Sequence, residues 1–212
     1  MPSIINIVYA SLGTFVIKRT LYLIIPLHSE NKKSIIMSSS RHQFTEWPTD
    51  LLIDYALKIH HRNIREKGPR LLKLARSIMD ENMVMTDIEQ LFSASLNDLE
   101  NHLSKEENVL FPYLYDLWEA ERKNQSIEQM HCGTISNPIR VMVLEHADEV
   151  ERHQQISALT NDYSAPADAS DDYKLLLEGL KDFAADLHEH VYIENEIIFP
   201  RCKLVEQRIV MM

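Results

Sequence analysis

The chain has 212 residues, of which 45% are hydrophobic, and its formal net charge of −10 at pH 7 gives a pI near 5.4. This length and hydrophobic content suffice for one well-packed domain rather than two. The acidic balance, with no basic stripe in the sequence, argues against nucleic acid as a partner. Cys132 and Cys202 are too few for a disulfide framework, so we expect free thiols and a cytoplasmic location.

The first 48 residues differ in character from the rest of the chain. Two apolar runs within residues 4–27 are separated by Lys18-Arg19, and neither reaches the roughly 20 residues of a membrane-spanning helix. No positive charge precedes them, as it would in a signal peptide. Met37, followed by three serines, resembles an ordinary start. We therefore predict an N-terminal extension over residues 1–48 that is poorly ordered or reflects a mis-assigned translation start; a membrane or export role, or structure within the domain, are the alternatives.

The first predicted helix begins after a Trp-Pro pair, with Thr49 or Asp50 as its N-cap. Apolar residues at helical spacing follow, and this stretch carries His60 and His61. A Gly-Pro pair ending at Pro69 is expected to kink or divide the helix, because proline cannot donate a backbone hydrogen bond.

Three further helices are predicted by the same periodicity. The second runs from about Thr86 to Leu110 and kinks or ends near Pro112, the third starts at Pro138, and the fourth covers Tyr173 to about Leu204. Polar loops separate these helices, and the whole chain contains only four glycines. Four long amphipathic segments predict an all-α, up-down-up-down four-helix bundle over residues 49–208.

The second and fourth predicted helices carry the same motif. It reads His102-Leu-Ser-Lys-Glu106 in one and His190-Val-Tyr-Ile-Glu194 in the other, each with an apolar-Phe-Pro tail and with equivalent residues 88 positions apart. A His and a Glu four residues apart lie on one helix face, so their donor atoms can converge as a metal site requires. One such pair is often only a surface hydrogen bond, but two copies with the same tail favour a metal site.

A matching metal site needs one histidine from each of the other two helices. The candidates are His60 or His61 in the first helix and His146 in the third, with His153 as the rival of His146. Buried histidines are often ordinary core residues, so the spacing alone leaves this choice open. Four histidines and two glutamates exceed one tetrahedral site, which predicts two metals bridged by both carboxylates and by an oxide or hydroxide. Nitrogen and oxygen donors suit iron, manganese or zinc.

This pattern resembles the hemerythrin-like (HHE) cation-binding domain, and most closely its branch of iron–sulfur cluster repair di-iron proteins. The resemblance covers about residues 50–205 and includes an Arg-Glu-x-x-Pro run that follows the paired histidines. In that branch the second histidine of the pair is the ligand. The resemblance implies a hemerythrin-like four-helix bundle with two iron ions in an oxo- or hydroxo-bridged di-iron centre, bound by His61, His102, Glu106, His146, His190 and Glu194.

The same resemblance implies a function in the response to nitrosative or oxidative stress. We expect a non-haem di-iron protein that repairs iron–sulfur clusters, with O2 or NO as a small diatomic ligand and iron–sulfur proteins as clients. Residues 1–49 contain no cysteine, whereas repair proteins of that branch usually carry adjacent cysteines there, and Asp80-Glu81-Asn82 stands where many members have a further histidine. The alternative is therefore a hemerythrin-like module that binds O2, NO or iron for storage or sensing without repair.

Other chemistries find less support in the sequence. A purely structural bundle with ordinary histidines is the third hypothesis. The sequence shows no glycine-rich phosphate loop, no nucleophile-elbow serine and no His-Glu-x-x-His string. Ferritin-like bundles use Glu-x-x-His, which differs from the motif here. Cys202, just after the second motif, is either a redox thiol or a small buried hydrophobic residue.

Overall fold

The computed structural model describes residues 44–131 and 133–209. Most of the predicted N-terminal extension, and Cys132, lie outside the described residues. The described chain consists of helices, turns and loops with no β-strand, which confirms the all-α prediction. Within it, no helix combines the length and apolar character needed to cross a membrane.

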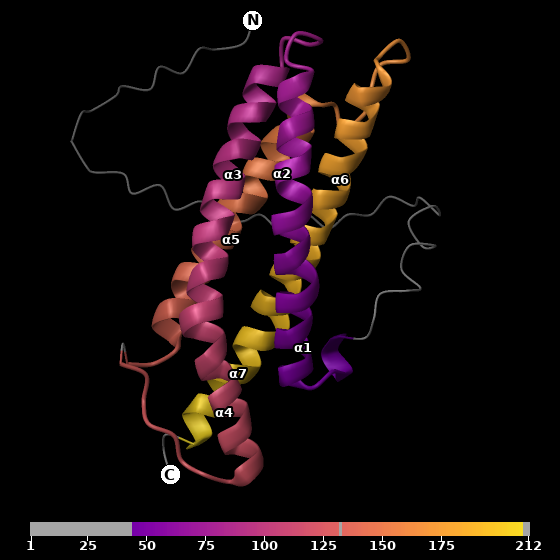
Figure 1. The fold of residues 1–212 in the computed structure, drawn as a ribbon. Helices are drawn as coiled ribbons and strands as arrows, with labels where there is room; N and C mark the ends of the chain where they lie inside the picture. The colour runs from indigo at the N-terminus through magenta and orange to yellow at the C-terminus, as the bar shows by residue number, and fades with distance from the viewer. Residues whose placement is uncertain (1–43, 132, 210–212) are drawn as a thin grey trace, which may run out of the picture. The chain divides into compact units, whose positions relative to one another are not determined.

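Four helical rods run alternately up and down (Figure 1), and the prediction of an up-down-up-down bundle is confirmed. A short π-helical segment interrupts three of the rods, and a 3-10 turn, η1, precedes the first. In chain order the elements are η1 (Phe44–Glu46); α1 (Thr49–Tyr55), η2 (Ala56–His61) and α2 (Arg62–Ser77); α3 (Met85–Lys105), η3 (Glu106–Leu110) and α4 (Phe111–Lys123); α5 (Ser136–Leu159); and α6 (Asp171–Tyr192), η4 (Ile193–Ile198) and α7 (Phe199–Ile209).

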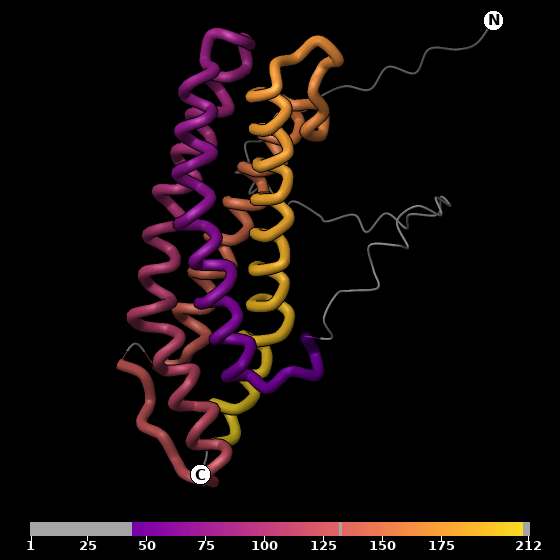
Figure 2. The backbone as a smooth tube through the Cα atoms, turned by 45° about the vertical axis from the view of Figure 1, so that its right-hand side comes forward, coloured from indigo at the N-terminus to yellow at the C-terminus, as the bar shows by residue number. Residues whose placement is uncertain are grey.

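Each rod lies against two others. Helix α2 packs against α3 and α6, and α5 packs against the same two helices from the opposite side. At the other end of the bundle, α4 contacts both α1 and α7. Figure 2 shows the rods side by side along most of their length. Residues at the middle of all four rods can therefore meet in the interior.

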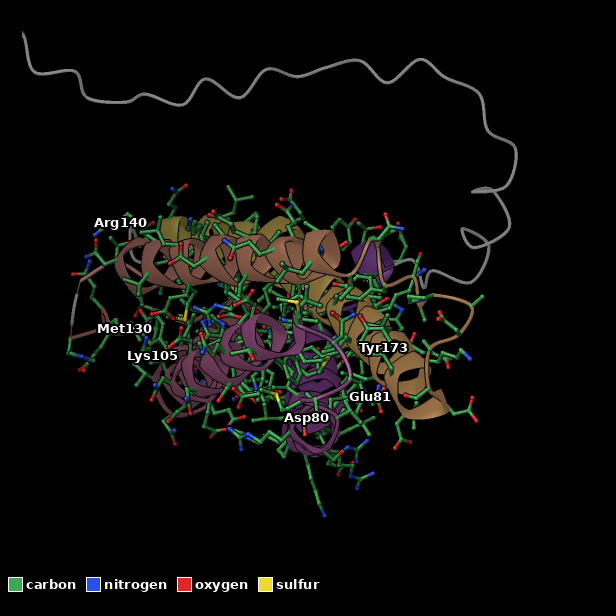
Figure 3. The ribbon with its side chains drawn as sticks, turned by 90° about the horizontal axis from the view of Figure 1, so that it is seen from above. Asp80, Glu81, Lys105, Met130, Arg140 and Tyr173 are labelled. Atoms are coloured by element: carbon green, nitrogen blue, oxygen red, sulfur yellow. The ribbon has the colours of Figure 1, made fainter. Side chains whose placement is uncertain are left out.

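The interior contains two apolar clusters rather than one. The first joins α1, α4 and α7 and includes Leu52, Phe111 and Phe199. The second joins α2, α3 and α6 and includes Phe92 and Phe183. In the view along the bundle from the α2–α3 connection, where Asp80 and Glu81 are labelled, side chains fill the space between the rods (Figure 3). A group of buried histidines and glutamates lies where the two clusters meet along the rods, and it forms a polar layer in the core: His61, His102, Glu106, His146, His190 and Glu194.

Several details of the helices differ from the sequence predictions. The first helix is capped by Pro48 without a side-chain hydrogen bond, so the prediction of Thr49 or Asp50 as N-cap is wrong. Pro69 does not divide the helix, because α2 continues through it to Ser77. The cost of a proline inside a helix is offset here by tertiary packing, which stabilises α2 against α3 and α6.

The second rod does not end near Pro112. Pro112 falls in the first turn of α4, directly after η3, and the rod continues through it to Lys123. Pro200 takes the same place in α7, directly after η4. Each motif therefore passes through a π segment into a new α-helix that begins with its Phe-Pro pair.

Candidate metal centre

The polar layer contains all six residues that the sequence singled out. Each has at most 2% of its surface exposed. His61 lies beside the others, with its Nε2 atom 3.4 Å from Oε2 of Glu106. Donor atoms of the remaining five lie within 4.8 Å of one another: His102, Glu106, His146, His190 and Glu194.

The π segments and the Phe-Pro tails help to build this arrangement. His61 ends η2, Glu106 begins η3 and Glu194 lies in η4. A π turn contains one more residue than an α turn, so it changes the face that the following residues present, and such turns are frequent at functional sites. The tail phenylalanines then turn inward: Phe111 stacks on His61 at 5.8 Å between ring centroids, and Phe199 stacks on His146 at 6.2 Å.

The carboxylate of Glu106, in the second rod, faces two groups of histidines at once. Oε1 of Glu106 is 3.4 Å from Nε2 of His102. Oε2 of the same carboxylate is 3.4 Å from Nε2 of His61 and 3.9 Å from Nε2 of His190. Glu106 thus points one oxygen toward His102 and the other toward the pair formed by His61 and His190.

Glu194 spans the same two groups from the opposite rod. Its Oε1 is 2.6 Å from Nε2 of His190, and its Oε2 is 3.2 Å from Nε2 of His146. Nε2 of His146 also lies 2.9 Å from Nε2 of His102, which puts these two histidines in one pair. Two nitrogens bound to one metal at right angles are about 3 Å apart when each metal–nitrogen distance is near 2.1 Å. The layout is therefore two histidine pairs with two carboxylates between them.

The outward-facing nitrogens of three of these rings are also held. A metal-binding imidazole usually donates its second N–H to an outer acceptor, which fixes the tautomer and the ring orientation. Three such contacts, each of 2.9 Å, join Nδ1 of His61 to Glu107, Nδ1 of His102 to Glu145, and Nδ1 of His146 to Asn195. The two carboxylate acceptors are held by cations: Arg65 donates to Glu107 at 2.6 Å, and Lys105, labelled in Figure 3, donates to Glu145.

The donor set fits a bound cation. Both carboxylate oxygens of Glu106, Oε2 of Glu194 and Nε2 of His61 are buried and have no hydrogen-bond partner in the described structure. Each buried polar atom without a partner costs about 1–3 kcal/mol. A cation at the centre of the layer would satisfy these atoms together, and nitrogen and oxygen donors without sulfur suit a transition metal.

The protonation equilibria of the layer are strongly perturbed. Burial alone would lower the pKa of His102, but Glu106, Glu194 and Glu145 raise it to about 9. Burial alone would raise the pKa of Glu194, but His190 and His146 hold it well below its usual range. His102 therefore holds a proton in the metal-free layer at neutral pH, and a metal ion would have to displace it, which couples binding to proton release.

The structure separates the histidines between which the sequence left a choice. Both His60 and His61 are fully buried, but it is His61 that faces Glu106, whereas Nδ1 of His60 lies 3.2 Å from Asp186. His153 lies apart from the layer, where its ring stacks on Phe183 at 5.5 Å. The geometry therefore brings His61, rather than His60, into contact with the carboxylate of Glu106.

Sequence reasoning missed the outer acceptors and left Cys202 undecided. Glu107, Glu145 and Asn195 each stand next to a predicted ligand in the sequence, which is the signal that could have found them. Cys202 is free and buried, and burial raises the pKa of its thiol to about 12. A redox role requires the thiolate, so this environment favours the buried hydrophobic interpretation.

Comparison with known proteins agrees with this geometry. The model of the hemerythrin HHE cation binding domain matches residues 52–202. A Haemophilus influenzae protein named "Probable iron-sulfur cluster repair protein" is 32% identical over 160 residues, which cover 71% of this chain and 63% of that protein. "Iron-sulfur cluster repair protein YtfE" of Musicola paradisiaca is 30% identical over 158 residues, covering 73% of this chain and 65% of that protein.

A third relative extends further along both chains. "Iron-sulfur cluster repair protein YtfE" of Pectobacterium atrosepticum is 28% identical over 179 residues, which cover 82% of this chain and 75% of that protein. The chain spans less than two thirds of the length of the first two relatives. The domain match includes all six clustered residues and most of the four rods. The chain therefore belongs to the hemerythrin HHE cation-binding domain family.

Proposed function

We propose that this chain is a non-haem di-iron protein of the iron–sulfur cluster repair type. One observation supports a count of two metals. Glu106 and Glu194 each direct one oxygen toward the pair of His102 and His146, and the other toward the pair of His61 and His190. Carboxylates in that position suit a bridge between two metals. The two ions would be held by His61, His102, Glu106, His146, His190 and Glu194.

Iron is the metal that we propose, because imidazole and carboxylate ligands suit it and the relatives are named as iron–sulfur cluster repair proteins. Two bound iron ions joined by an oxide or hydroxide would supply one-electron chemistry and an open position for a diatomic ligand such as O2 or NO. The chain's own residues hold the rings in place, exclude water through Phe111 and Phe199, and keep Nδ1 of three histidines hydrogen-bonded.

The proposal includes iron–sulfur proteins as clients, a stress-related role and a cytoplasmic location. It also retains residues 49–208 as the metal-binding domain. The printed names of the relatives support the repair role. They describe proteins longer than the part that this chain matches.

The test of repair is reactivation of an iron–sulfur enzyme whose cluster has been damaged by nitric oxide. The full chain, loaded with iron, should restore activity, whereas Glu194→Ala should not, because the variant loses a carboxylate from the centre. His188→Ala is the matched control, since His188 is an exposed histidine of α6 close in sequence to the motif. Equal restoration by the iron-loaded wild type and Glu194→Ala would contradict the proposal.

The second candidate is a module that binds O2, NO or iron without repairing clusters. It is favoured by the lack of cysteine in residues 1–49. Reversible changes in the absorption spectrum on adding and removing the gas, without reactivation of the damaged enzyme, would support this candidate instead.

A further inference from the structure

Arg65 connects a clustered histidine to the neighbouring rod through a carboxylate. It stands four residues after His61, so the two side chains lie about one turn apart on the first rod. Glu107, from the second rod, contacts both of them. Its Oε1 atom lies 2.9 Å from Nδ1 of His61 and accepts a hydrogen bond of 2.6 Å from Nη1 of Arg65. The carboxylate therefore lies between the imidazole ring and the guanidinium group.

The guanidinium group is anchored at a second point. Nη2 of Arg65 donates to Oε2 of Glu107 at 3.2 Å, so two bonds hold this carboxylate. Nε and Nη2 also donate to the two oxygens of Glu100, earlier on the second rod, at 2.9 Å each. Two-bond contacts of this kind fix the orientation of a carboxylate as well as its position. Arg65 therefore leaves Glu107 little freedom to turn away from His61.

Lys105 takes the equivalent place beside the other histidine pair. It stands three residues after His102 on the same rod, and its ammonium group donates to Oε1 of Glu145 in α5. The other oxygen of that carboxylate lies 2.9 Å from Nδ1 of His102. In each histidine pair, one ring therefore has an outer carboxylate that is held by a cation from the ring's own rod.

Both carboxylates lie at the edge of the bundle, where water competes for their oxygens. The side chain of Glu107 is 27% exposed and that of Glu145 is 30% exposed, whereas the histidines they contact are buried. Ordering a partly exposed glutamate costs conformational entropy. A cation that already fixes the carboxylate removes most of this cost before a metal binds. The same ion pairs contribute little to the stability of the fold, because they are exposed to water.

We propose that Arg65 and Lys105 are positioning residues of the metal centre, each of which holds the outer carboxylate of the clustered histidine one turn earlier on its own rod. The proposal rests on the proposed metal centre. Neither cation binds the metal; each acts through its carboxylate on the orientation of one ring. Arg65 is also the first residue of the Arg-Glu-x-x-Pro run, which thereby acquires a role at the site.

Positioning and simple electrostatics predict opposite effects of removing Arg65. A positive side chain near a metal site repels the metal ion, so its loss alone would tighten binding. Loss of positioning would instead free the carboxylate of Glu107, and with it the ring of His61, so binding would weaken. The direction of the change therefore distinguishes the two effects.

The test titrates Co2+, whose visible absorption reports binding, into the full metal-free chain against a competing chelator. The wild type should bind two ions. Arg65→Gln should weaken the binding of one of them about 10-fold, at the lower end of the loss typical for an outer partner of a metal ligand. Glu107→Gln should weaken it by as much or more. The double variant should be no weaker than Glu107→Gln, because Arg65 acts only through that carboxylate.

Lys105→Gln, Glu145→Gln and their double variant make the same comparison at the other histidine pair. The loss should again fall on one ion and should not add in the double variant. Because the two cations serve different pairs, combining Arg65→Gln with Lys105→Gln should weaken the binding of both ions.

Arg76→Gln is the matched control. Arg76 forms an exposed ion pair with Glu89 between the same two helices, α2 and α3, further from the clustered residues. Its loss should leave the binding of both ions unchanged. For either cation, unchanged or tighter binding in the single variant would overturn its role, as would losses that add when its carboxylate is also replaced. Failure of the wild type to bind two ions would overturn the proposed metal centre, and this role with it.

Discussion

At the level of single residues, the interior face of α5 explains why the sequence could not choose between its histidines. His146 and His153 are both buried on the same face of this helix. What distinguishes them is the side chains on the facing rods. His146 meets His102 and Glu194, whereas His153 contacts the rings of Phe92 and Phe183. Periodicity predicts which residues point inward, but it does not predict what they meet there.

The environment of His153 predicts a dependence of stability on pH. Burial, together with the positive charges of His188 and Arg152, lowers the pKa of His153 from its usual 6.5 to about 4. A histidine whose pKa is depressed in the folded state stabilises the fold fully above pH 6.5 and loses this contribution as the pH falls toward 4. The loss from this group is at most about 3 kcal/mol.

The measurement compares the free energy of unfolding of wild type and His153→Leu across this range. Glu149, which bonds to Ser95 beside His153 and to Arg152, has a pKa raised by burial and contributes the opposite slope. Because Glu149 is present in both proteins, the difference between them isolates His153. The variant should lose less stability than wild type as the pH falls from 6.5 to 4, and parallel profiles would contradict this account.

Glu106 should stabilise the metal-free protein as well as bind metal. Its carboxylate oxygens lie 3.4 Å from Nε2 of His102 and from Nε2 of His61, and Glu106 is one of the groups that raise the pKa of buried His102 to about 9. Glu106→Leu removes one partner of a buried charge pair, so it should lower the free energy of unfolding of the metal-free protein at pH 7 by about 3–5 kcal/mol. It should also abolish binding of one or both metal ions. Chemical denaturation and metal analysis of the same variant test these two effects, and a variant as stable as wild type without metal would argue against the prediction.

At the level of the elements, the helices themselves were predictable and their irregular parts were not. Apolar residues recur at helical spacing in all four rods, and this signal placed each of them. A π segment adds one residue to a turn, so η2, η3 and η4 leave almost no trace in the periodicity. Proline gave a misleading signal at Pro69, because local propensity is overridden when the surrounding helix is packed on both sides.

Pro69 offers a direct test of that explanation. It lies inside α2 and is exposed, so its ring contributes little to packing while its missing N–H weakens the helix. Pro69→Ala should raise the free energy of unfolding by roughly 1–3 kcal/mol. Lys73→Ala, at an exposed position one turn later, should change it by no more than about 0.5 kcal/mol. A destabilised Pro69→Ala would mean that the rod needs the proline to bend toward its partners.

At the level of the whole molecule, one repeated motif organises the core. The two copies place equivalent His-Glu pairs on facing rods, and the polar layer they form separates two apolar clusters. The six clustered residues could be predicted because the repeat and the family resemblance restrict the choice. The outer acceptors Glu107, Glu145 and Asn195 could not be predicted, because they depend on which rods face each other across the bundle.

The central claim is that this layer binds two iron ions between the paired histidines. Its most direct test is an anaerobic titration of the full metal-free chain with Fe2+, followed by metal analysis after removal of unbound ions. We predict two ions per wild-type chain and fewer than two in Glu194→Ala, which lacks one of the bridging carboxylates. Saturation of the wild type at one ion or none, or the same content in both proteins, would contradict the account.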